Sequence, residues 1–418
     1  MATAFVLCIT LLNIKGQTSA PYSSTTSDTT KLITFPNTLL SNSFEKVKIP
    51  LIKKGNEKPF WILPSIAWNN YDKTQLGVLF GIERDEHYQV LISPMYGMGS
   101  GNLTGFMDAS YFFGTPRIEQ WTIGLQARRF SYLLFPEDLS YNTIKPSIHL
   151  TPNIKMKGSI RFGIKSTYAW QEYLLNGRQT QNFNFHNIDF DYSIEDEKFT
   201  VQSDFDFQFN RIYGLVKWTN QFTFPFLSSP GNSAVLKTFM GGFLFNNSSP
   251  SNINPPVPIF QLSGLSNTGI YWLQKDYGFD DWYLDRNAQD NFLRKQVASS
   301  EGGFYSPTSI GNTNNFMAAV NLKSDLSIPV RVKKWLNFQI FANSAVVKNQ
   351  YVKAALYGEA GTSIFFFNQL VGFHIPVVST NNIKQNQQTI FNIGSRDWTQ
   401  RISFSLDILR LKELAQNK

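Results

Sequence analysis

The chain has 418 residues, a net charge of +8, and an unusual balance of 16% charged and 15% aromatic residues. A positive balance is typical of nucleic-acid-binding proteins, but those carry a basic stripe, and no run of Lys or Arg exceeds two residues. Nucleic acid is therefore excluded as a partner. Few charges and many aromatics favour a protein that shows apolar side chains to lipid and polar ones to a wet interior.

The first 20 residues carry a short apolar run, Ala4–Leu12, followed by small and polar residues. This pattern is typical of a secretory signal peptide, although the usual basic start is missing. Cys8, the only cysteine, falls within it, so a mature chain would contain no disulfide, thiolate metal site or cysteine nucleophile. Residues 21–57, which begin with a Ser/Thr-rich stretch, are expected to form a linker or periplasmic extension.

Alternating apolar and polar residues begin soon afterwards and persist to residue 411. They are clear in the stretches 74–84, 87–97, 121–130, 159–170, 187–209, 315–328, 335–344 and 401–409. Side chains alternate between the two faces of a strand, so each stretch predicts one apolar and one polar face. The lengths suit tilted strands that cross a bilayer, and no later stretch is apolar enough for a transmembrane helix.

The predicted fold is all-β: a transmembrane antiparallel β-barrel of about 16 strands over residues 58–411, with a short tail at 412–418. Residues 247–312 break the alternation and predict one long extracellular loop or a plug. A large soluble β-sandwich or propeller is the competing interpretation. Polar candidates for the lumen, all on the face opposite the apolar side chains, are Arg128, Arg161, Lys165, Asp189, Asp191, Asp204, Asp206, Lys323 and Asp325.

The stretch 198–210 raises the choice between core and lipid most sharply. Phe199, Val201, Phe205, Phe207 and Phe209 share one face, which only Ser203 interrupts. Aromatic residues also gather at predicted strand ends, as they do in the interfacial girdles of barrels. We therefore expect these phenylalanines to face lipid, and Asp204 and Asp206 to face the lumen.

Possible chemical sites are weak. Histidines 149 and 374 lie near Ser147 and Ser379, but proximity in sequence does not establish the Ser–His–acid geometry that hydrolysis needs. Asp276, Asp280, Asp281, Asp285 and Asp290 offer oxygen ligands for Ca²⁺ or for cations at a lipopolysaccharide surface, or are simply solvated loop carboxylates. The glycine-rich stretch 97–105 lacks a phosphate-loop ending and predicts a hairpin turn. We predict no catalytic, cofactor or metal site.

Four stretches together resemble a known family: NNYDKTQLGVLFG, SPMYGMGSGNLTGFMDASYFFG, the stretch from DDWYLDRN through EGGFYSPTS to NLKSDL, and QRISFSLDILRL. They are similar to the C-terminal barrel region of Gram-negative outer-membrane proteins in which the barrel follows a gluzincin-type zinc aminopeptidase-like domain. The resemblance covers about residues 45–411. The zinc signature H-E-x-x-H is absent, so no catalytic residue carries over.

The expected function is that of a non-catalytic outer-membrane barrel, exported by its signal peptide, that serves as a membrane anchor or scaffold. Its expected partners are outer-membrane lipid, lipopolysaccharide and a periplasmic or surface protein. A porin or substrate-specific transporter is one alternative, and a barrel hydrolase is the other. Lumenal charges of both signs fit either a pore or a lumen closed by pairing across it.

Overall fold

The structure, a computed structural model, describes residues 60–407 apart from positions 70, 85–86, 135–136, 155–156, 175–177, 197–198, 226–231, 248–258, 266–291, 298–300, 327–331, 333–334, 350–353, 368, 390–392 and 394–397. The predicted signal peptide (1–20), linker (21–57) and tail (412–418) lie outside these residues. The same holds for the five loop aspartates between 276 and 290.

Sixteen β-strands form one sheet in which every strand is antiparallel to its neighbours in sequence, which confirms the predicted all-β barrel class and strand number. The strands are β1 (Phe60–Asn69), β2 (Lys73–Arg84), β3 (Tyr88–Gly97), β4 (Leu103–Thr115), β5 (Ile118–Leu134), β6 (Glu137–Pro152), β7 (Gly158–Leu174), β8 (Arg178–Glu195), β9 (Thr200–Phe209), β10 (Tyr213–Pro225), β11 (Ser233–Asn246), β12 (Phe316–Asp325), β13 (Leu336–Lys348), β14 (Ala355–Phe366), β15 (Val371–Ser379) and β16 (Ser403–Leu406).

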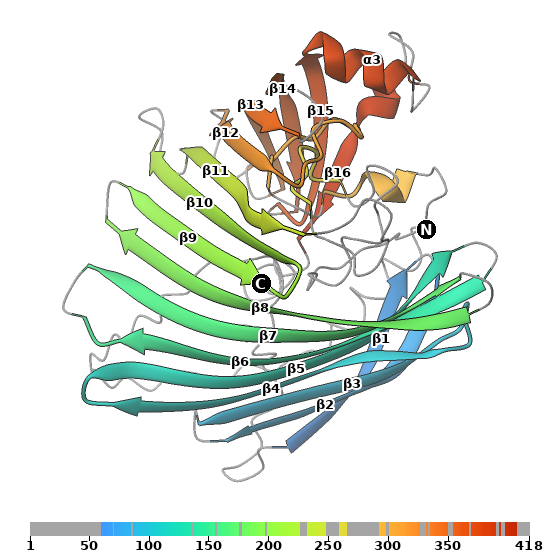
Figure 1. The fold of residues 1–418 in the computed structure, drawn as a ribbon, viewed down its shortest axis with the longest axis vertical. Helices are drawn as coiled ribbons and strands as arrows, with labels where there is room; N and C mark the ends of the chain where they lie inside the picture. The colour runs from blue at the N-terminus through green and yellow to red at the C-terminus, as the bar shows by residue number, and fades with distance from the viewer. Residues whose placement is uncertain are drawn as a thin grey trace.

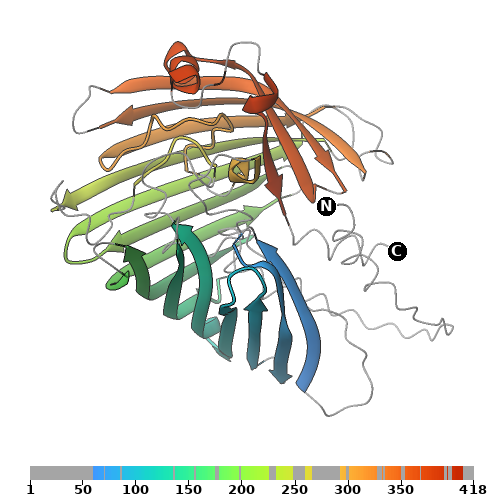
Figure 2. The same ribbon diagram turned by 90° about the vertical axis from the view of Figure 1, so that its right-hand side faces the viewer.

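The sheet curls around a central space, as Figures 1 and 2 show from two directions. Neighbouring strands pair in chain order from β1 to β16, and within the described residues no pairing joins β1 to β16. No helix in the described part of the chain is long and apolar enough to span a membrane.

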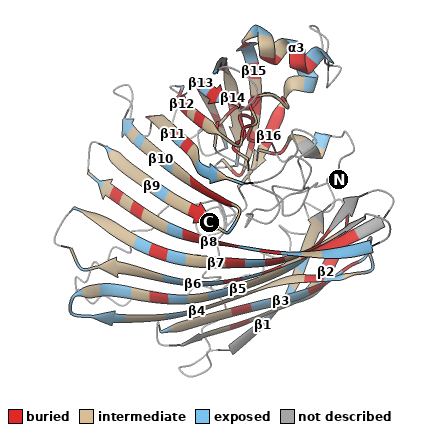
Figure 3. Ribbon diagram, in the orientation of Figure 1, coloured by how far each residue is buried: buried red, intermediate tan, exposed pale blue. Residues whose placement is uncertain are grey.

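Burial alternates along the strands because one set of side chains faces the interior and the other faces outward (Figure 3). Large apolar side chains of the outward set are exposed across the sheet: Ile66, Leu76, Ile92, Ile123, Ile148, Ile164, Ile188, Phe205, Trp218, Met240, Val320, Ile340 and Leu356 are all at least 39% exposed. A soluble sandwich would bury such side chains between two sheets, whereas a single sheet that shows them outward needs lipid.

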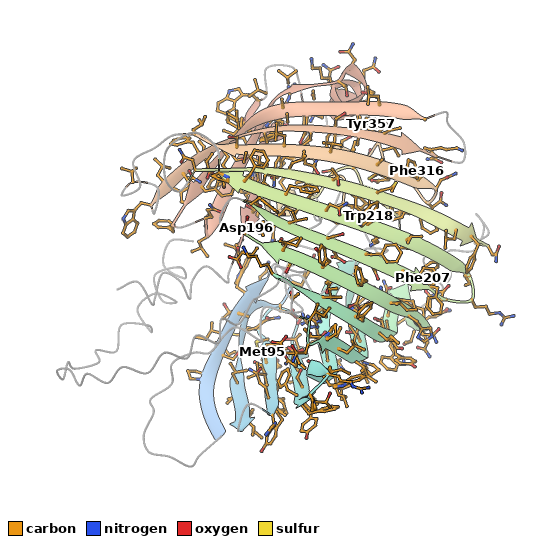
Figure 4. All side chains as sticks on the ribbon, turned by 90° about the vertical axis from the view of Figure 1, so that its left-hand side faces the viewer. Met95, Asp196, Phe207, Trp218, Phe316 and Tyr357 are labelled. Atoms are coloured by element: carbon orange, nitrogen blue, oxygen red, sulfur yellow. The ribbon has the colours of Figure 1, made fainter. Side chains whose placement is uncertain are left out.

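The stretch that raised the question of core or lipid lies in β9, on the outer face seen in Figure 4, where Phe207 and Trp218 are labelled. Ser203, the exception to its apolar face, accepts a hydrogen bond of 3.0 Å from the indole Nε1 of Trp218 on β10. An indole N–H in hydrocarbon needs an acceptor. The polar interruption therefore satisfies an outward tryptophan.

The two ends of the barrel differ. At one end the connections are short or moderate, for example residues 116–117 between β4 and β5. At the other end, hereafter the long-loop end, two long connections leave the sheet: β11 to β12 (residues 247–315) and β15 to β16 (residues 380–402). The predicted long segment 247–312 thus coincides with the β11–β12 connection.

A short helix was not predicted. Helix α3 (Asn381–Thr389, NNIKQNQQT) lies in the β15–β16 connection, and single 3₁₀ turns lie at Phe292–Lys295 and Trp398–Arg401. Ile383 is the only apolar residue in α3, so the helix shows no apolar stripe of 3.6-residue period. Its buried residues, Ile383, Asn386 and Gln387, nevertheless share one side.

Candidate functional site: a segment docked in the lumen

The predicted lumenal residues lie on strand faces opposite the exposed apolar side chains, and six of them come together on β7–β9. Asp189 lies directly across from Asp206, and Asp191 lies across from Asp204, on neighbouring strands β8 and β9. Arg161 of β7 is the partner of Asp191 on the other side. Two carboxylates directly opposite each other repel. The aspartates therefore need the neighbouring basic side chains to stabilise their ionised form.

The cross-strand row of Asp189 and Asp206 also contains two residues that the sequence did not single out as lumenal. Lys217 of β10 lies across from Asp206, and the Nε2 atom of His149 lies 3.8 Å from an Asp189 carboxylate oxygen. Gly163 stands between His149 and Asp189, and a Cβ there would collide with both side chains. The glycine therefore makes room for the pair. Lys165 lies across from Asn187, whose amide donates to Asp206 at 2.8 Å.

The remaining three predicted residues lie apart from this group. Arg128 lies on β5, with Nη2 4.0 Å from an Asp108 carboxylate oxygen on β4. Lys323 on β12 places its Nζ 5.2 Å from the ring centroid of Tyr305. Asp325 is buried at the end of β12. The nine residues therefore form one charged group and three separate sites.

Asp325 has a structural role. Its Oδ2 accepts from the backbone N–H and the hydroxyl of Ser233, and its Oδ1 accepts from the side-chain amides of Asn337 and Gln339. We predict that Asp325→Ala lowers the free energy of unfolding by about 3 kcal/mol, because buried donors lose their acceptor. Urea unfolding of the folded barrel in lipid vesicles, followed by tryptophan fluorescence, measures this. Asp325→Asn, which keeps an acceptor oxygen, should lose less; equal losses would contradict the role.

Toward the long-loop end the inner wall is apolar instead of charged. Tyr141 of β6, Phe183 and Phe185 of β8, and Leu215 of β10 point inward and are buried. They belong to one cluster with Phe260, Leu262 and Phe304 of the β11–β12 connection. The inner wall of β6–β10 therefore carries its charged group nearer the other end, and toward the long-loop end it is apolar and packs against an inserted segment.

We call the described residues 259–265 and 301–315 the lumen segment; Figure 2 shows this part of the chain on the concave side of the sheet. Its Phe260 ring lies 5.9 Å from the Phe239 ring and 5.3 Å from the Phe243 ring of β11, both edge-on. Phe260, Leu262 and Phe304 are at most 1% exposed. Within the predicted loop or plug 247–312, the stretches 249–258 and 271–283 lie outside the described residues.

A buried carboxylate on the wall holds the segment's backbone. Glu359 of β14, 4% exposed, accepts from the backbone N–H of Tyr305 at 2.6 Å and of Ser306 at 3.0 Å, through different oxygens. The amide of Asn343 on β13 donates to the same Glu359 at 2.8 Å and also to the Gly303 carbonyl at 3.0 Å. Asn321 of β12 donates to the Gly302 carbonyl at 2.9 Å. The backbone of 302–306 is thus bound on both its donors and its acceptors.

An ion pair fixes the start of this stretch. Lys217 on β10 donates to Glu301 at 3.0 Å, and the other Glu301 oxygen accepts from the backbone N–H of Gln261 at 2.9 Å. Glu301 therefore ties the two halves of the lumen segment to each other and to the wall. At Gly303 the backbone turns with φ +74°, a conformation that side chains disfavour, and a Cβ would also meet the Asn321 side chain.

The Tyr305 ring packs flat on the imidazole of His374 in β15, with centroids 3.9 Å apart. His374 uses both ring nitrogens on serines: Nδ1 with Ser363 at 2.8 Å and Nε2 with Ser405 at 3.1 Å. It does not bond to Ser379, its neighbour in sequence, and no carboxylate orients it. The imidazole is 2% exposed. This arrangement positions the aromatic ring of the segment and offers no Ser–His–acid geometry.

Helix α3 closes over the far end of the segment. The Asn386 side-chain oxygen accepts from the Thr308 hydroxyl and the Ser309 backbone N–H, each at 2.9 Å. Both long connections of the long-loop end therefore meet above the lumen. Among the described residues, no group of His, Cys, Asp and Glu side chains is arranged to hold a metal ion.

The glycine-rich stretch 97–105 forms the predicted hairpin turn between β3 and β4, and Gly101 and Gly105 have positive φ. Asp72, in the neighbouring turn after β1, accepts from the Ser100 hydroxyl at 2.5 Å and from the Gln75 amide at 2.7 Å. The two turns that carry part of the family resemblance are therefore tied to each other.

Sequence reasoning missed Glu359, Asn321, Asn343 and the Lys217–Glu301 pair. Glu359 lies among small residues in the stretch YGEAGT. It alternates with the small residues Gly358 and Ala360, and this alternation was the available signal that its carboxylate faces inward. The stretch EGGF was noticed for its resemblance only.

No protein-family model matches the chain, and no curated protein matches it. Among solved structures the chain is similar to BamA from Haemophilus ducreyi lacking POTRA domains 1–3, with a TM-score of 0.46 and 10% identity, over 78% of this chain and 68% of that one. It is also similar to CdiB from Acinetobacter baumannii, with a TM-score of 0.41 and 10% identity, over 79% of this chain and 58% of that one. For CdiB from Escherichia coli the TM-score is 0.40 and the identity 8%, over 78% of this chain and 61% of that one. The chain thus spans about three fifths of each CdiB chain.

Proposed function

We propose that the chain is a non-catalytic integral outer-membrane β-barrel whose lumen is closed by its own lumen segment, and that it acts as a membrane anchor or docking scaffold. The observation that carries this proposal is the bond set of Glu359, which binds two consecutive backbone N–H groups of the segment from the barrel wall. Hydrogen bonds in a buried, low-dielectric setting are strong, so we expect the segment to stay in the lumen and obstruct the passage of solutes.

The scaffold role agrees with the resemblance to barrels that carry an aminopeptidase-like domain. In such an arrangement a periplasmic or surface protein docks on the barrel, and lipopolysaccharide surrounds it. The proposal includes no catalysis, because His374, the histidine with two serine partners, is buried and lacks an acidic partner. Among the described residues, no Ser–His–acid arrangement supports the barrel hydrolase alternative.

A porin or substrate-specific transporter is the second candidate. The charged group of β6–β10, with Arg161, Lys165, Asp189 and Asp206 facing inward, favours it, since a wet path needs polar walls. Basic and acidic side chains lie there on directly neighbouring strands. We expect such a path, if opened, to discriminate weakly between cations and anions.

Conductance across a planar bilayer separates the two candidates. The purified, refolded chain is expected to insert without stable conductance steps, because the lumen segment remains docked. Heat-modifiable migration in detergent gels provides the control that the barrel has folded. Discrete, stable steps from the unmodified chain would overturn the closed-lumen proposal and favour a transporter. Co-purification of a partner from native membranes then tests the scaffold role.

A further inference from the structure

The lipid-facing surface contains a polar row where apolar side chains are expected. Ser203 of β9, Asn220 of β10 and Thr238 of β11 are direct cross-strand neighbours and all point outward. The neighbouring outward row on one side is Phe205, Trp218 and Met240, and on the other side Val201, Phe222 and Leu236. The polar row is therefore enclosed by apolar rows on the outward face of the sheet. Figure 4 labels Trp218, a member of one of these apolar rows.

Each of its members takes part in a hydrogen bond. The Ser203 hydroxyl accepts from Trp218, and the Thr238 hydroxyl accepts from the Asn220 amide over a long 3.4 Å. An asparagine amide offers two N–H donors and an oxygen with two lone pairs. Within the described residues this single long bond is all that Asn220 makes, so its side-chain oxygen receives no hydrogen bond from them.

This arrangement is costly in lipid. Hydrocarbon offers no hydrogen bonds, and an amide transferred there without partners loses several kcal/mol relative to water. Leucine or phenylalanine, which fill the adjoining positions, would avoid the loss. A group that supplies both a donor and an acceptor in the plane of the membrane would remove it.

We propose that β9–β11 form a contact surface for a second copy of this chain, centred on Asn220. A two-fold axis along the membrane normal places the same residue on both sides of the interface. The amide is self-complementary: each Nδ2 donates to the Oδ1 of the other copy, so one residue type satisfies both. Trp218, Phe222 and Met240, which are 43%, 39% and 44% exposed, surround the amide pair and pack across the interface.

The inference does not depend on the closed lumen or on the scaffold role, because it uses only outward residues. It also explains why an asparagine, and not a charged residue, occupies the centre of the row. An unpaired charge at this depth costs more than an amide and cannot pair with its own copy.

The test uses cysteine cross-linking in membranes that contain the full chain with Cys8→Ala, since Cys8 is the only cysteine. Phe222→Cys, which leaves Asn220 in place and is 39% exposed in the wild-type chain, is compared with Ile148→Cys on β6, an outward position that is 49% exposed and lies on another part of the sheet. On mild oxidation we expect disulfide-linked dimers at position 222 and only background at position 148. Equal yields would indicate random collision and would overturn the proposal.

Association is then measured by single-molecule photobleaching in bilayers for Asn220→Leu, which suits a lipid-facing site and should fold well. We expect an association constant about tenfold lower, the effect of losing two modest hydrogen bonds inside a membrane. Ile148→Leu is the matched control and should change nothing. A monomeric wild-type chain would show that lipid or another protein covers the row, and an unchanged dimer in Asn220→Leu would place the interface elsewhere; either result overturns the proposal.

Discussion

Replacement of Glu359 by alanine is expected to give frequent conductance steps in planar bilayers, where none are expected from the wild-type chain. Glu359 accepts from the backbone N–H groups of Tyr305 and Ser306 and from the Asn343 amide. Without it, three donors in a buried site lose their acceptor, at about 1–3 kcal/mol for an unsatisfied group. A net loss of about 2 kcal/mol raises the undocked fraction of the segment roughly thirtyfold.

Two variants separate this effect from general damage to the barrel. Glu359→Gln keeps one acceptor oxygen and should open the lumen less often than Glu359→Ala. Asp204→Asn removes a carboxylate from the same lumen but on β9, across from Asp191 and away from the backbone of 302–306. It should insert without steps. Equal opening by Asp204→Asn and Glu359→Ala would mean that lumenal charge, and not the held backbone, keeps the lumen closed.

The barrel was predictable because alternation is a local signal that repeats. Each of β2, β7, β9 and β13 carries its own period of two, so strand number and the orientation of most side chains follow without long-range information. Ser203 looked like an error in that pattern and is the acceptor for Trp218 on the next strand. Only the cross-strand register, which sequence does not supply, assigns the serine this role.

The lumen segment was predictable as an irregular stretch but not as a docked one. Its anchors, Lys217 and Glu301, are 84 positions apart, and Glu359 lies 53 positions beyond Ser306. No periodic signal connects such residues. Helix α3 was missed for a related reason: its buried side consists of amides that bond to Thr308 and Ser309, so its packing is polar and leaves no apolar stripe.

Reversal of the Lys217–Glu301 ion pair is expected to open the lumen in each single variant and to close it again in the double variant. Lys217→Glu would bring a carboxylate to both Glu301 and Asp206, which lies directly across from position 217. Glu301→Lys would oppose Lys217 and remove the acceptor for the Gln261 N–H. Each single variant should therefore show steps at a frequency comparable to Glu359→Ala.

In the double variant Lys217→Glu/Glu301→Lys the pair is restored with opposite polarity, and step frequency should fall toward the wild-type level. The side chains are 28% and 19% exposed, so solvent screens the attraction only partly, and a coupling of about 1–2 kcal/mol is expected. Restoration should be incomplete because the reversed pair leaves a carboxylate beside Asp206. High salt should weaken the coupling between positions 217 and 301, since partly exposed charges are screened. Additive effects of the two reversals would show that Lys217 and Glu301 act separately, and that their ion pair does not hold the segment to the wall.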